Sequence, residues 1–317
     1  MRPAAGLERL RHARGGAAAI AYTGGMTPAA SLSTARNHLW PPRLALGGCI
    51  RGILARDTRG AALTPAQRFN HFPATPMATL TWWLAGTSER LPPDAKADLA
   101  MPRNPPLARI LFGGPQGRPT VTWNPGDVHT LTLVLAPDAV RLLAGIDPGA
   151  WVNRWAPAAD VLPPDWLRMC DAVVAAVDDD ARVRLAQDFL EPLWHAARPS
   201  PAFGLPRYRD WAQALALRAG LSASGRSVRQ IERRIKEWTG QPLRELRGVG
   251  RTEQAFFEAI LAQGDSGPRW ADVAASAGYS DQSHLCRETR RVTGFSPEEL
   301  RQRIRQDETF WAYRIWR

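Results

Sequence analysis

The sequence predicts an α+β protein with an N-terminal β-containing part, a helical connector and an all-α C-terminal part. Three observations predict this order. Short tracts rich in branched and aromatic residues, separated by Gly and Pro, fill the chain up to Leu135. Helical periodicity replaces them from Pro137 onward. Near the C-terminus one short helical pattern occurs twice at a constant spacing, which indicates a duplicated helical unit.

The N-terminal tracts are expected to be strands. They contain mainly Leu, Ile, Val, Thr and Trp, and they end at Gly-Gly, Pro-Pro or Asn-Pro-Gly breaks, which favour turns. The tracts cover residues 45–55, 77–84, 109–112, 119–123 and 129–135. Trp82, Trp83 and Trp123 are candidates for lining an apolar pocket, although packing in the core is the use that we favour.

Helical patterns follow at residues 137–143, 166–177 and 181–195, and the Pro-rich segment 198–201 is expected to be a linker. Asp178, Asp179 and Asp180 are expected to form a solvated cap before the third helix, where negative charge is favourable. The predicted domains are a flexible basic tail (1–25), an N-terminal domain (26–200), a helical domain (205–306) and an aromatic and basic tail (307–317).

The repeat consists of an apolar anchor, an arginine, a second cation and a Thr-Gly ending. Ile231, Arg233, Lys236, Thr239, Gly240, Glu245 and Leu246 return as Leu285, Arg287, Arg290, Thr293, Gly294, Glu299 and Leu300. Two copies of a basic helix suggest two contacts with one long, regular and negatively charged partner. Duplex DNA fits this description, because its major groove returns to the same side once per turn, roughly every 34 Å.

The first copy, residues 227–238, has Val228, Ile231, Ile235 and Trp238 at helical spacing on one side. Ser227 is the expected N-cap and Gly240 the expected residue after the helix. The second copy, residues 282–292, follows a short apolar helix that begins at Trp270 and a turn centred on Gly278. This order of helix, glycine turn and helix predicts a helix-turn-helix unit.

At these residues the chain resembles the AraC/XylS family of transcription regulators. The residues that carry the resemblance in the second unit are Trp270, Val273, Ala274, Gly278, Tyr279, Asp281, Ser283, Arg287, Arg290, Gly294, Ser296 and Pro297. Arg251, Ala255, Ser227, Ile231, Arg233 and Lys236 extend it backwards. The chain departs from the family in three places. Thr289 stands where a large aromatic residue is usual, residues 241–243 replace the usual Ser-Pro, and the turn at 222–226 looks longer.

The resemblance implies two helix-turn-helix subdomains joined by a linker helix, with one recognition helix from each subdomain in adjacent major-groove segments. The residues expected to read bases are Arg229, Glu232, Arg233, Gln282, Ser283, His284 and Arg287. Those expected to contact phosphates are Arg234, Lys236, Arg247, Arg290 and Arg291. A formal net charge of +11 and a pI of about 10.7 also favour a polyanionic partner.

The N-terminal part resembles the input domains of the same family more faintly. This resemblance implies a sensor of a small-molecule effector or a dimerisation domain, and the residues name no ligand. A homodimer and, for an activator, RNA polymerase are further partners that it implies. The three cysteines lie far apart without a Cys-x-x-Cys pair, and no apolar stretch is long enough to span a membrane, so we expect a reduced, cytoplasmic protein.

Enzymatic, metal and cofactor motifs are missing from the sequence, and we therefore expect a protein that is not an enzyme and has no cofactor or metal. His38, His71 and His129 are isolated from one another, and each is expected to be structural or exposed. The alternatives are a purely structural N-terminal domain, or one with an enzymatic activity such as DNA-repair alkyl transfer. Alkyl transfer needs an activated cysteine, and Cys49 and Cys170 lack a sequence context for activation.

Overall fold

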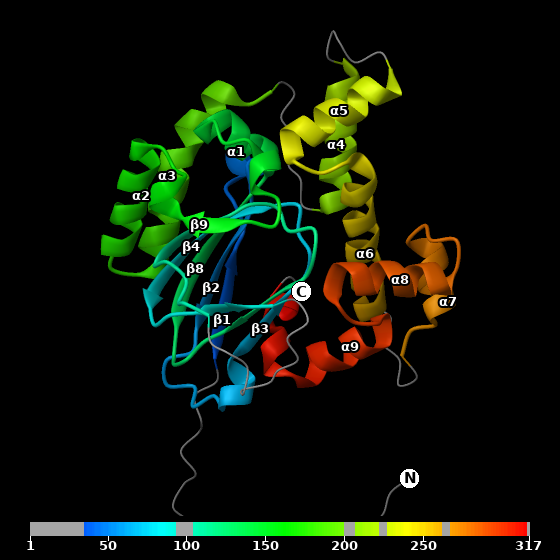
Figure 1. Cartoon of the computed structure of the whole chain (residues 1–317), viewed down its shortest axis with the longest axis horizontal. Coiled ribbons are helices and arrows are strands. Elements are labelled where there is room, and N and C mark those ends of the chain that lie inside the picture. Colours follow the sequence, from blue (N-terminus) through cyan, green and yellow to red (C-terminus); the bar gives the residue numbers. More distant parts are fainter. Residues whose placement is uncertain (1–34, 93–103, 200–206, 222–226, 262–266, 316–317) are drawn as a thin grey trace, which may run out of the picture. The chain divides into compact units, whose positions relative to one another are not determined.

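The N-terminal part of the computed structural model contains two antiparallel sheets, and helices form the rest (Figure 1). The structure describes residues 35–92, 104–199, 207–221, 227–261 and 267–315. The predicted tail at 1–25, the turn at 222–226 and the second half of the predicted 198–201 linker lie outside the described residues. The predicted α+β class with a helical connector and an all-α C-terminal part is confirmed.

Within the described residues the larger sheet has six strands in the order β1-β2-β8-β4-β6-β9. The strands are β1 (Arg36–Trp40), β2 (Ile50–Asp57), β4 (Ala78–Ala85), β6 (Ile110–Gly113), β8 (His129–Leu135) and β9 (Trp155–Pro157). Their two faces differ because side chains alternate along a strand. Leu80, Leu131 and Leu133 point into the hydrophobic core on one face, whereas Thr81 and Thr132 pair on the other, with their hydroxyl oxygens 3.1 Å apart.

The smaller sheet has the order β3-β7-β5, formed by β3 (Phe69–Phe72), β7 (Thr120–Trp123) and β5 (Glu89–Leu91). All five predicted tracts contain strand, but the first was placed too early. Residues 44–46 form a 3₁₀ helix, and β2 begins only at Ile50, after Gly47 and Gly48. The sequence analysis missed β1, β3, β5 and β9, which are at most five residues long and lack a periodic apolar pattern.

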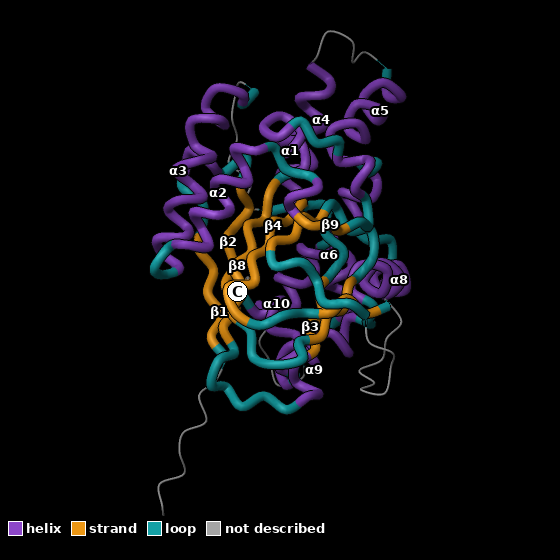
Figure 2. Tube along the Cα trace, turned by 60° about the vertical axis from the view of Figure 1, so that its left-hand side comes forward, coloured by secondary structure: helices purple, strands orange, loops and turns teal. Residues whose placement is uncertain are grey.

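Three helices, α1 (Pro137–Ala144), α2 (Pro164–Ala175) and α3 (Asp179–Ala197), follow β8. α2 and α3 pack together against the apolar face of the larger sheet (Figures 1 and 2). Trp166 of α2 and Trp194 of α3 share one core with Trp82 of β4. The burial of these apolar side chains supplies the main driving force for this packing.

The aspartate run before α3 is only partly the solvated cap that was expected. Asp178 caps the helix by accepting a hydrogen bond from the backbone N–H of Ala181 at 2.7 Å. Asp179 is instead half-buried, and its carboxylate binds Arg182 at 2.8 Å and the ring of His129 at 2.9 Å. Hydrogen bonds from these two partners hold the pKa of Asp179 below its usual value, despite its burial. The run therefore also ties α3 to strand β8.

The C-terminal part is helical. Its helices are α4 (Tyr208–Leu221), α5 (Val228–Thr239), α6 (Leu243–Leu261), α7 (Trp270–Ser276), α8 (Gln282–Thr293), α9 (Pro297–Gln306) and α10 (Trp311–Arg314). α4 and α5 form the first helix-turn-helix unit, α7 and α8 form the second, and α6 links them (Figure 1). Among the described residues, none of the helices combines the length and apolar character needed to cross a bilayer.

The end of the chain, predicted as an aromatic and basic tail, packs against the N-terminal part. A 3₁₀ helix at Glu308–Phe310 and α10 both contact β3. The indole N–H of Trp311 donates to the side-chain oxygen of Asn70 at 2.8 Å, and Glu308 binds the buried Arg56 at 3.0 Å. The ring of Phe310 stacks on His71 with centroids 4.7 Å apart. The tail thus joins the second helix-turn-helix unit to the smaller sheet.

Candidate nucleic-acid interface

Helix α5 begins and ends as its sequence predicts. Ser227 and Gln230 form a capping box, in which each side chain accepts a hydrogen bond from the other residue's backbone N–H at 3.3 Å. Gly240 ends the helix with a φ of +76°, a conformation that favours glycine. The expected apolar side is correct for Ile231, Ile235 and Trp238. It is wrong for Val228, which lies in the first turn and is 74% exposed.

The opposite side of α5 is available to a partner. Arg229, Glu232 and Arg233, the three residues expected to read bases, are all exposed. Lys236 is exposed as well, whereas Arg234 is half-buried with its guanidinium 6.0 Å from the centre of the Trp238 ring. The helix therefore packs through one side and presents charged side chains on the other, in the division that the periodicity predicts.

Helix α8 has the same construction. Asp281 caps it by accepting a hydrogen bond from the backbone N–H of His284 at 2.7 Å, and this bond lowers the pKa of the Asp281 carboxyl group. Gly278, in the turn before it, and Gly294, after it, have φ angles of +77° and +86°. Leu285 and Val292 are buried on the inner side.

On the outer side of α8, Gln282, Ser283, Arg287 and Arg290 are exposed. His284 is half-buried, and its ring lies edge-on to Tyr279 with centroids 5.2 Å apart. Its Nδ1 is also 3.2 Å from the Ser280 hydroxyl. The structure thus brings together the second set of expected base readers, with His284 held more firmly than the rest.

The expected phosphate contacts have different surroundings. Arg290 on α8 and Arg247 on α6 are exposed. The guanidinium of Arg291 instead binds the carboxylate of Glu288 at 3.0 Å. Because this pairing already neutralises its charge, Arg291 is a weaker candidate for a phosphate contact than Arg290.

Residues 221–303 match the profile of a family described as a helix-turn-helix domain. This range includes both copies of the repeated helix and the linker helix between them. The C-terminal region is an AraC-type helix-turn-helix domain. The predicted resemblance is therefore confirmed for this region, and the chain carries a DNA-binding domain of transcription regulators.

Solved structures of ToxT from Vibrio cholerae are similar to the chain at low identity, whereas no curated protein matches it. The apo form of a ToxT variant has a TM-score of 0.36 and 10% identity, covering 78% of this chain and 95% of that chain. ToxT from strain O395 has a TM-score of 0.33 and 11% identity, covering 74% and 93%. Wild-type ToxT with bound unsaturated fatty acid has a TM-score of 0.35 and 9% identity, covering 74% and 91%. Similarity this low carries no argument about this chain.

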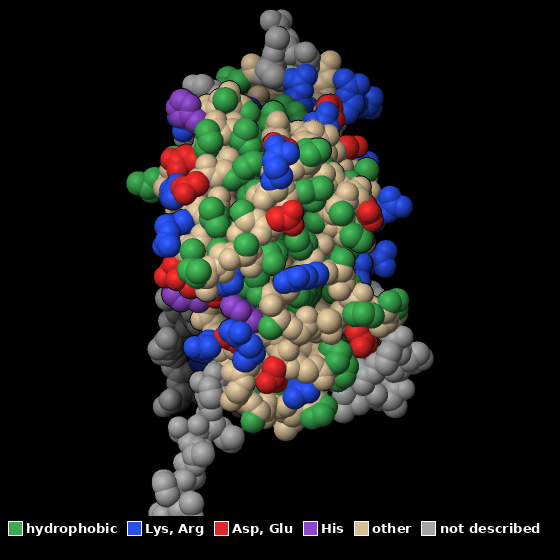
Figure 3. Space-filling model, turned by 90° about the vertical axis from the view of Figure 1, so that its left-hand side faces the viewer, with side chains coloured by type: hydrophobic (Ala, Val, Ile, Leu, Met, Phe, Trp, Pro, Cys, Tyr) green, Lys and Arg blue, Asp and Glu red, His purple; other side chains and the backbone are tan. Residues whose placement is uncertain are grey.

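The AraC-type domain does not turn its charged helix faces toward the N-terminal part. The first unit touches that part through α4, where Arg218 binds Asp138 of α1 at 2.8 Å, and through the C-terminal end of α5, where Arg141 of α1 binds Glu237 at 2.8 Å. Gly240 packs there against the carbonyl group of Pro148. The face of the molecule formed around α2 and α3 has acidic and basic side chains dispersed among apolar ones (Figure 3). It is therefore a poor alternative as a DNA-binding surface.

A second candidate site, which the sequence analysis missed, is a cavity of about 180 Å³ between the two sheets. Its walls are rich in threonine, namely Thr75, Thr79, Thr81, Thr120, Thr122, Thr130 and Thr132. Tyr208 of α4 and Trp311 of α10 also line it, so the C-terminal part contributes to its wall. A signal was present in the sequence, because Thr alternates with Leu or Trp in residues 78–83 and 129–133.

Two buried donors of this cavity lack hydrogen-bond acceptors within the part of the chain that the structure describes. They are the indole N–H of Trp83 and the Nε of Arg56. Other atoms of Arg56 bind Asn37 at 2.9 Å and Glu308 at 3.0 Å, and burial lowers the pKa of Arg56. Trp82 and Trp123 pack in cores as expected, whereas Trp83 lines this cavity, whose surface is mainly apolar despite its threonines, which is the other use expected for it.

The remaining candidates for chemistry do not assemble into a catalytic or metal site. His38 is exposed, His129 binds Asp179, and burial against Phe310 lowers the pKa of His71 to about 4. No group of His, Cys, Asp or Glu in the described ranges could hold a metal ion. Burial raises the pKa of Cys49, and it raises that of Cys170 to about 12, which is the reverse of thiol activation.

Proposed function

We propose that this chain is a sequence-specific transcription regulator that inserts α5 and α8 into adjacent major-groove segments on one face of duplex DNA. The observation that carries this proposal is the pair of equivalent helices, each capped, each presenting an exposed charged face, and joined by α6. A major groove admits one such helix, and neighbouring segments on the same face are about one helical turn apart.

Each exposed side chain has a chemical role in this proposal. Arg229, Arg233 and Arg287 suit guanine O6 and N7, Gln282 suits adenine, and Glu232 accepts from cytosine N4. Ser283 and His284 complete the base-reading set of α8. Arg234, Lys236, Arg247 and Arg290 contact phosphates, which position the protein without reading sequence, and Arg291 joins them only where a phosphate replaces Glu288 as its partner. The expected partners are cytoplasmic duplex DNA, RNA polymerase if the protein activates, and a second copy of the chain if it dimerises.

We further propose that a small, partly apolar molecule with hydrogen-bond acceptors in the threonine-rich cavity controls DNA binding. The unpaired donors of Trp83 and Arg56 support a ligand with hydrogen-bond acceptors, because buried donors without partners are costly. Trp311 and Tyr208 support the link to DNA binding, since each lines this cavity and belongs to the C-terminal part. The ligand would act by changing the population of DNA-competent arrangements.

Selection of bound duplexes from a random pool tests the DNA-binding proposal. The expected result is two conserved half-sites separated by roughly 10 base pairs. The matched control is Arg184→Ala, which removes an exposed arginine from α3, away from both helices. This variant should select the same site as the wild type. A random or single short motif would contradict insertion of two helices.

Thermal-shift screening of the full chain with neutral sugars, polyols and amides tests ligand control. A ligand of the cavity should raise the melting temperature, and Trp83→Phe should reduce that shift by removing the unpaired indole N–H. The same ligand should change the affinity for the selected DNA site. Absence of any shift across the panel would count against ligand control while leaving the DNA-binding proposal intact.

A further inference from the structure

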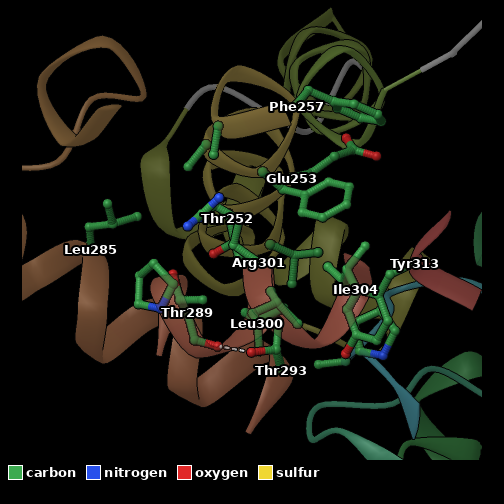
Figure 4. A pocket seen from close by; sticks show the side chains of 18 of the residues that line it. Thr252, Glu253, Phe257, Leu285, Thr289, Thr293, Leu300, Arg301, Ile304 and Tyr313 are labelled. Carbon is green, nitrogen blue, oxygen red and sulfur yellow. Dashed lines mark hydrogen bonds between the residues drawn. The ribbon is translucent and has the colours of Figure 1, made fainter. Parts of the chain in front are cut away.

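A second cavity lies where the second helix-turn-helix unit and α6 meet Arg51, Pro73 and Ala74 of the N-terminal part. It has a volume of about 170 Å³ and lies among α6, α8, α9 and α10 (Figure 4). Its inner wall is largely apolar, with Leu285, Val292, Leu300 and Ile304 among the residues that line it. Protein interiors are close-packed, and voids larger than a water molecule are few, so a cavity of this size calls for a specific cause.

The cause is a combination of short side chains at positions that face one another. Thr289 of α8 is buried and lines the cavity, at the position where the sequence resemblance leads one to expect a large aromatic residue. Ala255 and Ala259 of α6 line the cavity as well. The side chains that α6 and α8 contribute at these positions are therefore short, and the cavity lies beside them beneath α8.

A buried tyrosine at this cavity has no hydrogen-bond partner. Tyr313 of α10 lines the cavity and is 6% exposed, and its hydroxyl group has no partner among the described residues. Two other buried tyrosines do have partners. The hydroxyl of Tyr279 is 3.0 Å from that of Thr252, and the hydroxyl of Tyr208 is 2.9 Å from that of Thr75. The contrast singles out Tyr313, because buried hydroxyl groups are rarely left without a partner.

The charged residues around the cavity are largely compensated. The guanidinium of Arg301 binds Glu298 at 2.6 Å, and Arg51 forms an ion pair with Glu253. Arg305 lies on the exposed side of α9. A ligand with a formal charge would thus gain little here and would lose its hydration. A neutral ligand fits better.

From these observations we propose that the cavity beneath α8 binds a small, neutral, mainly apolar molecule that carries one hydrogen-bond acceptor, to which the Tyr313 hydroxyl donates. The size is suitable, since an engineered apolar cavity of roughly 150 Å³ is known to bind benzene. The site adjoins the threonine-rich cavity, since Pro73, Tyr208 and Ala312 line both, but the rest of its lining is different. Ligand binding at this cavity does not require that α8 reads DNA, so this proposal and the DNA-binding proposal can fail independently.

The test compares acetophenone with ethylbenzene on the full chain, by calorimetry and by the shift in melting temperature. The two probes have similar size and shape, but only acetophenone has a carbonyl acceptor. We expect acetophenone to bind about tenfold more tightly, the usual effect of one buried hydrogen bond. Equal affinity for both probes, or no binding of either, would overturn the proposal.

Three variants locate the binding. Tyr313→Phe should bind both probes with equal affinity, because the donor is lost and the shape is kept. Thr289→Phe, or Thr289→Leu if the larger residue prevents folding, should bind neither probe because its side chain fills the space. Thr132→Val, in the other cavity, is the matched control and should bind both probes as the wild type does. Binding that survives filling at position 289, or that is lost in the control, would place the probes elsewhere and refute the assignment.

Discussion

Helices α5 and α8 have nearly the same sequence pattern, yet they pack into different surroundings. Ile235 of α5 belongs to the large core that also contains the sheet residues Leu131 and Leu133. Leu285, its equivalent in α8, belongs to a separate small cluster within the second unit. The comparison teaches that a repeated helix can extend the core of another domain in its first copy and pack mainly within its own unit in its second.

The two units are also attached to the N-terminal part by partly different contacts. The first is attached through the Arg141–Glu237 ion pair of α5, the Arg218–Asp138 ion pair of α4 and the close contact of Gly240 with Pro148. The second combines the Arg56–Glu308 ion pair with ring contacts, since His71 of β3 contacts both Phe295 and Phe310. These differences lead to four predictions, beginning with the largest effect.

Truncation of the two equivalent core residues should reduce the free energy of unfolding by different amounts in the two units. Ile235→Ala should reduce the free energy of unfolding by about 4 kcal/mol, whereas Leu285→Ala should reduce it by about 2–3 kcal/mol. Ile235 is enclosed by the large core, but Leu285 already borders the cavity and has fewer atoms to lose contact with. Denaturant unfolding of the full chain measures both values. A larger loss for Leu285→Ala would break the comparison.

Replacement of the glycine that ends each helix should again cost more stability in α5 than in α8. Gly240→Ala should destabilise the protein by about 3 kcal/mol and Gly294→Ala by about 1–2 kcal/mol, the usual penalty for a left-handed alanine. A Cβ at position 240 would lie 2.7 Å from the carbonyl oxygen of Pro148, whereas one at 294 would be 3.7 Å from Pro119. Melting temperatures of both variants check the order. Equal losses would show that the contact at Pro148 relaxes at little cost.

Acid should weaken the attachment of the second unit. Burial lowers the pKa of His71 from 6.5 to about 4, whereas the unfolded chain takes up this proton near pH 6.5. The stability contributed by neutral His71 is therefore complete above about pH 6.5 and is lost as the pH falls toward 4. The loss should reach about 3 kcal/mol, since the pKa falls from 6.5 to about 4 and one pKa unit is worth about 1.4 kcal/mol.

Denaturant unfolding at several pH values measures this loss, and His71→Phe is the control because it keeps a ring and removes the titration. Asp307 and Arg303 also act on His71 electrostatically, in opposite directions. A variant that keeps the full pH dependence between 6.5 and 4 would assign the effect to another group.

Alanine variants of two arginines on α8 should distinguish base reading from phosphate contact. Arg287→Ala should weaken binding to the selected site by about 1–3 kcal/mol and relax the preference at one base pair. Arg290→Ala should weaken binding to all sequences alike and reduce the salt dependence. Fluorescence anisotropy at several salt concentrations, with matched and substituted duplexes, measures both effects. An unchanged site preference in Arg287→Ala would contradict its assignment.

Much of the C-terminal region could be predicted because its signals are local. The boundaries of α5 and α8 agree with the predicted helices to within one residue. Ser227 and Asp281 cap the first turns through side-chain hydrogen bonds, and Gly240 and Gly294 end the helices with a positive φ. The error at Val228 shows the limit of this reasoning. Periodicity places it on the apolar side, but no neighbouring element covers the first turn there.

The N-terminal part was predicted only in outline. Strand tracts were found where apolar residues are dense, but β3 and β5 depend on partners far along the chain, with Phe69 and Glu89 both facing Trp123. Both cavities were missed for the same reason. Each cavity is formed between elements that are distant in sequence, and the pattern of any one segment therefore does not predict it.

The sequence by itself determined the α+β order, the caps of the recognition helices and their charged outer faces, because turns, caps and helical periodicity act over a few neighbouring residues. Tertiary structure alone decided that α5 shares the core of the sheet domain while α8 does not, and that the last helix separates two cavities. The physical reason is that packing depends on which surfaces meet, and residues such as Trp311 and Asn70 meet only once the whole chain has folded.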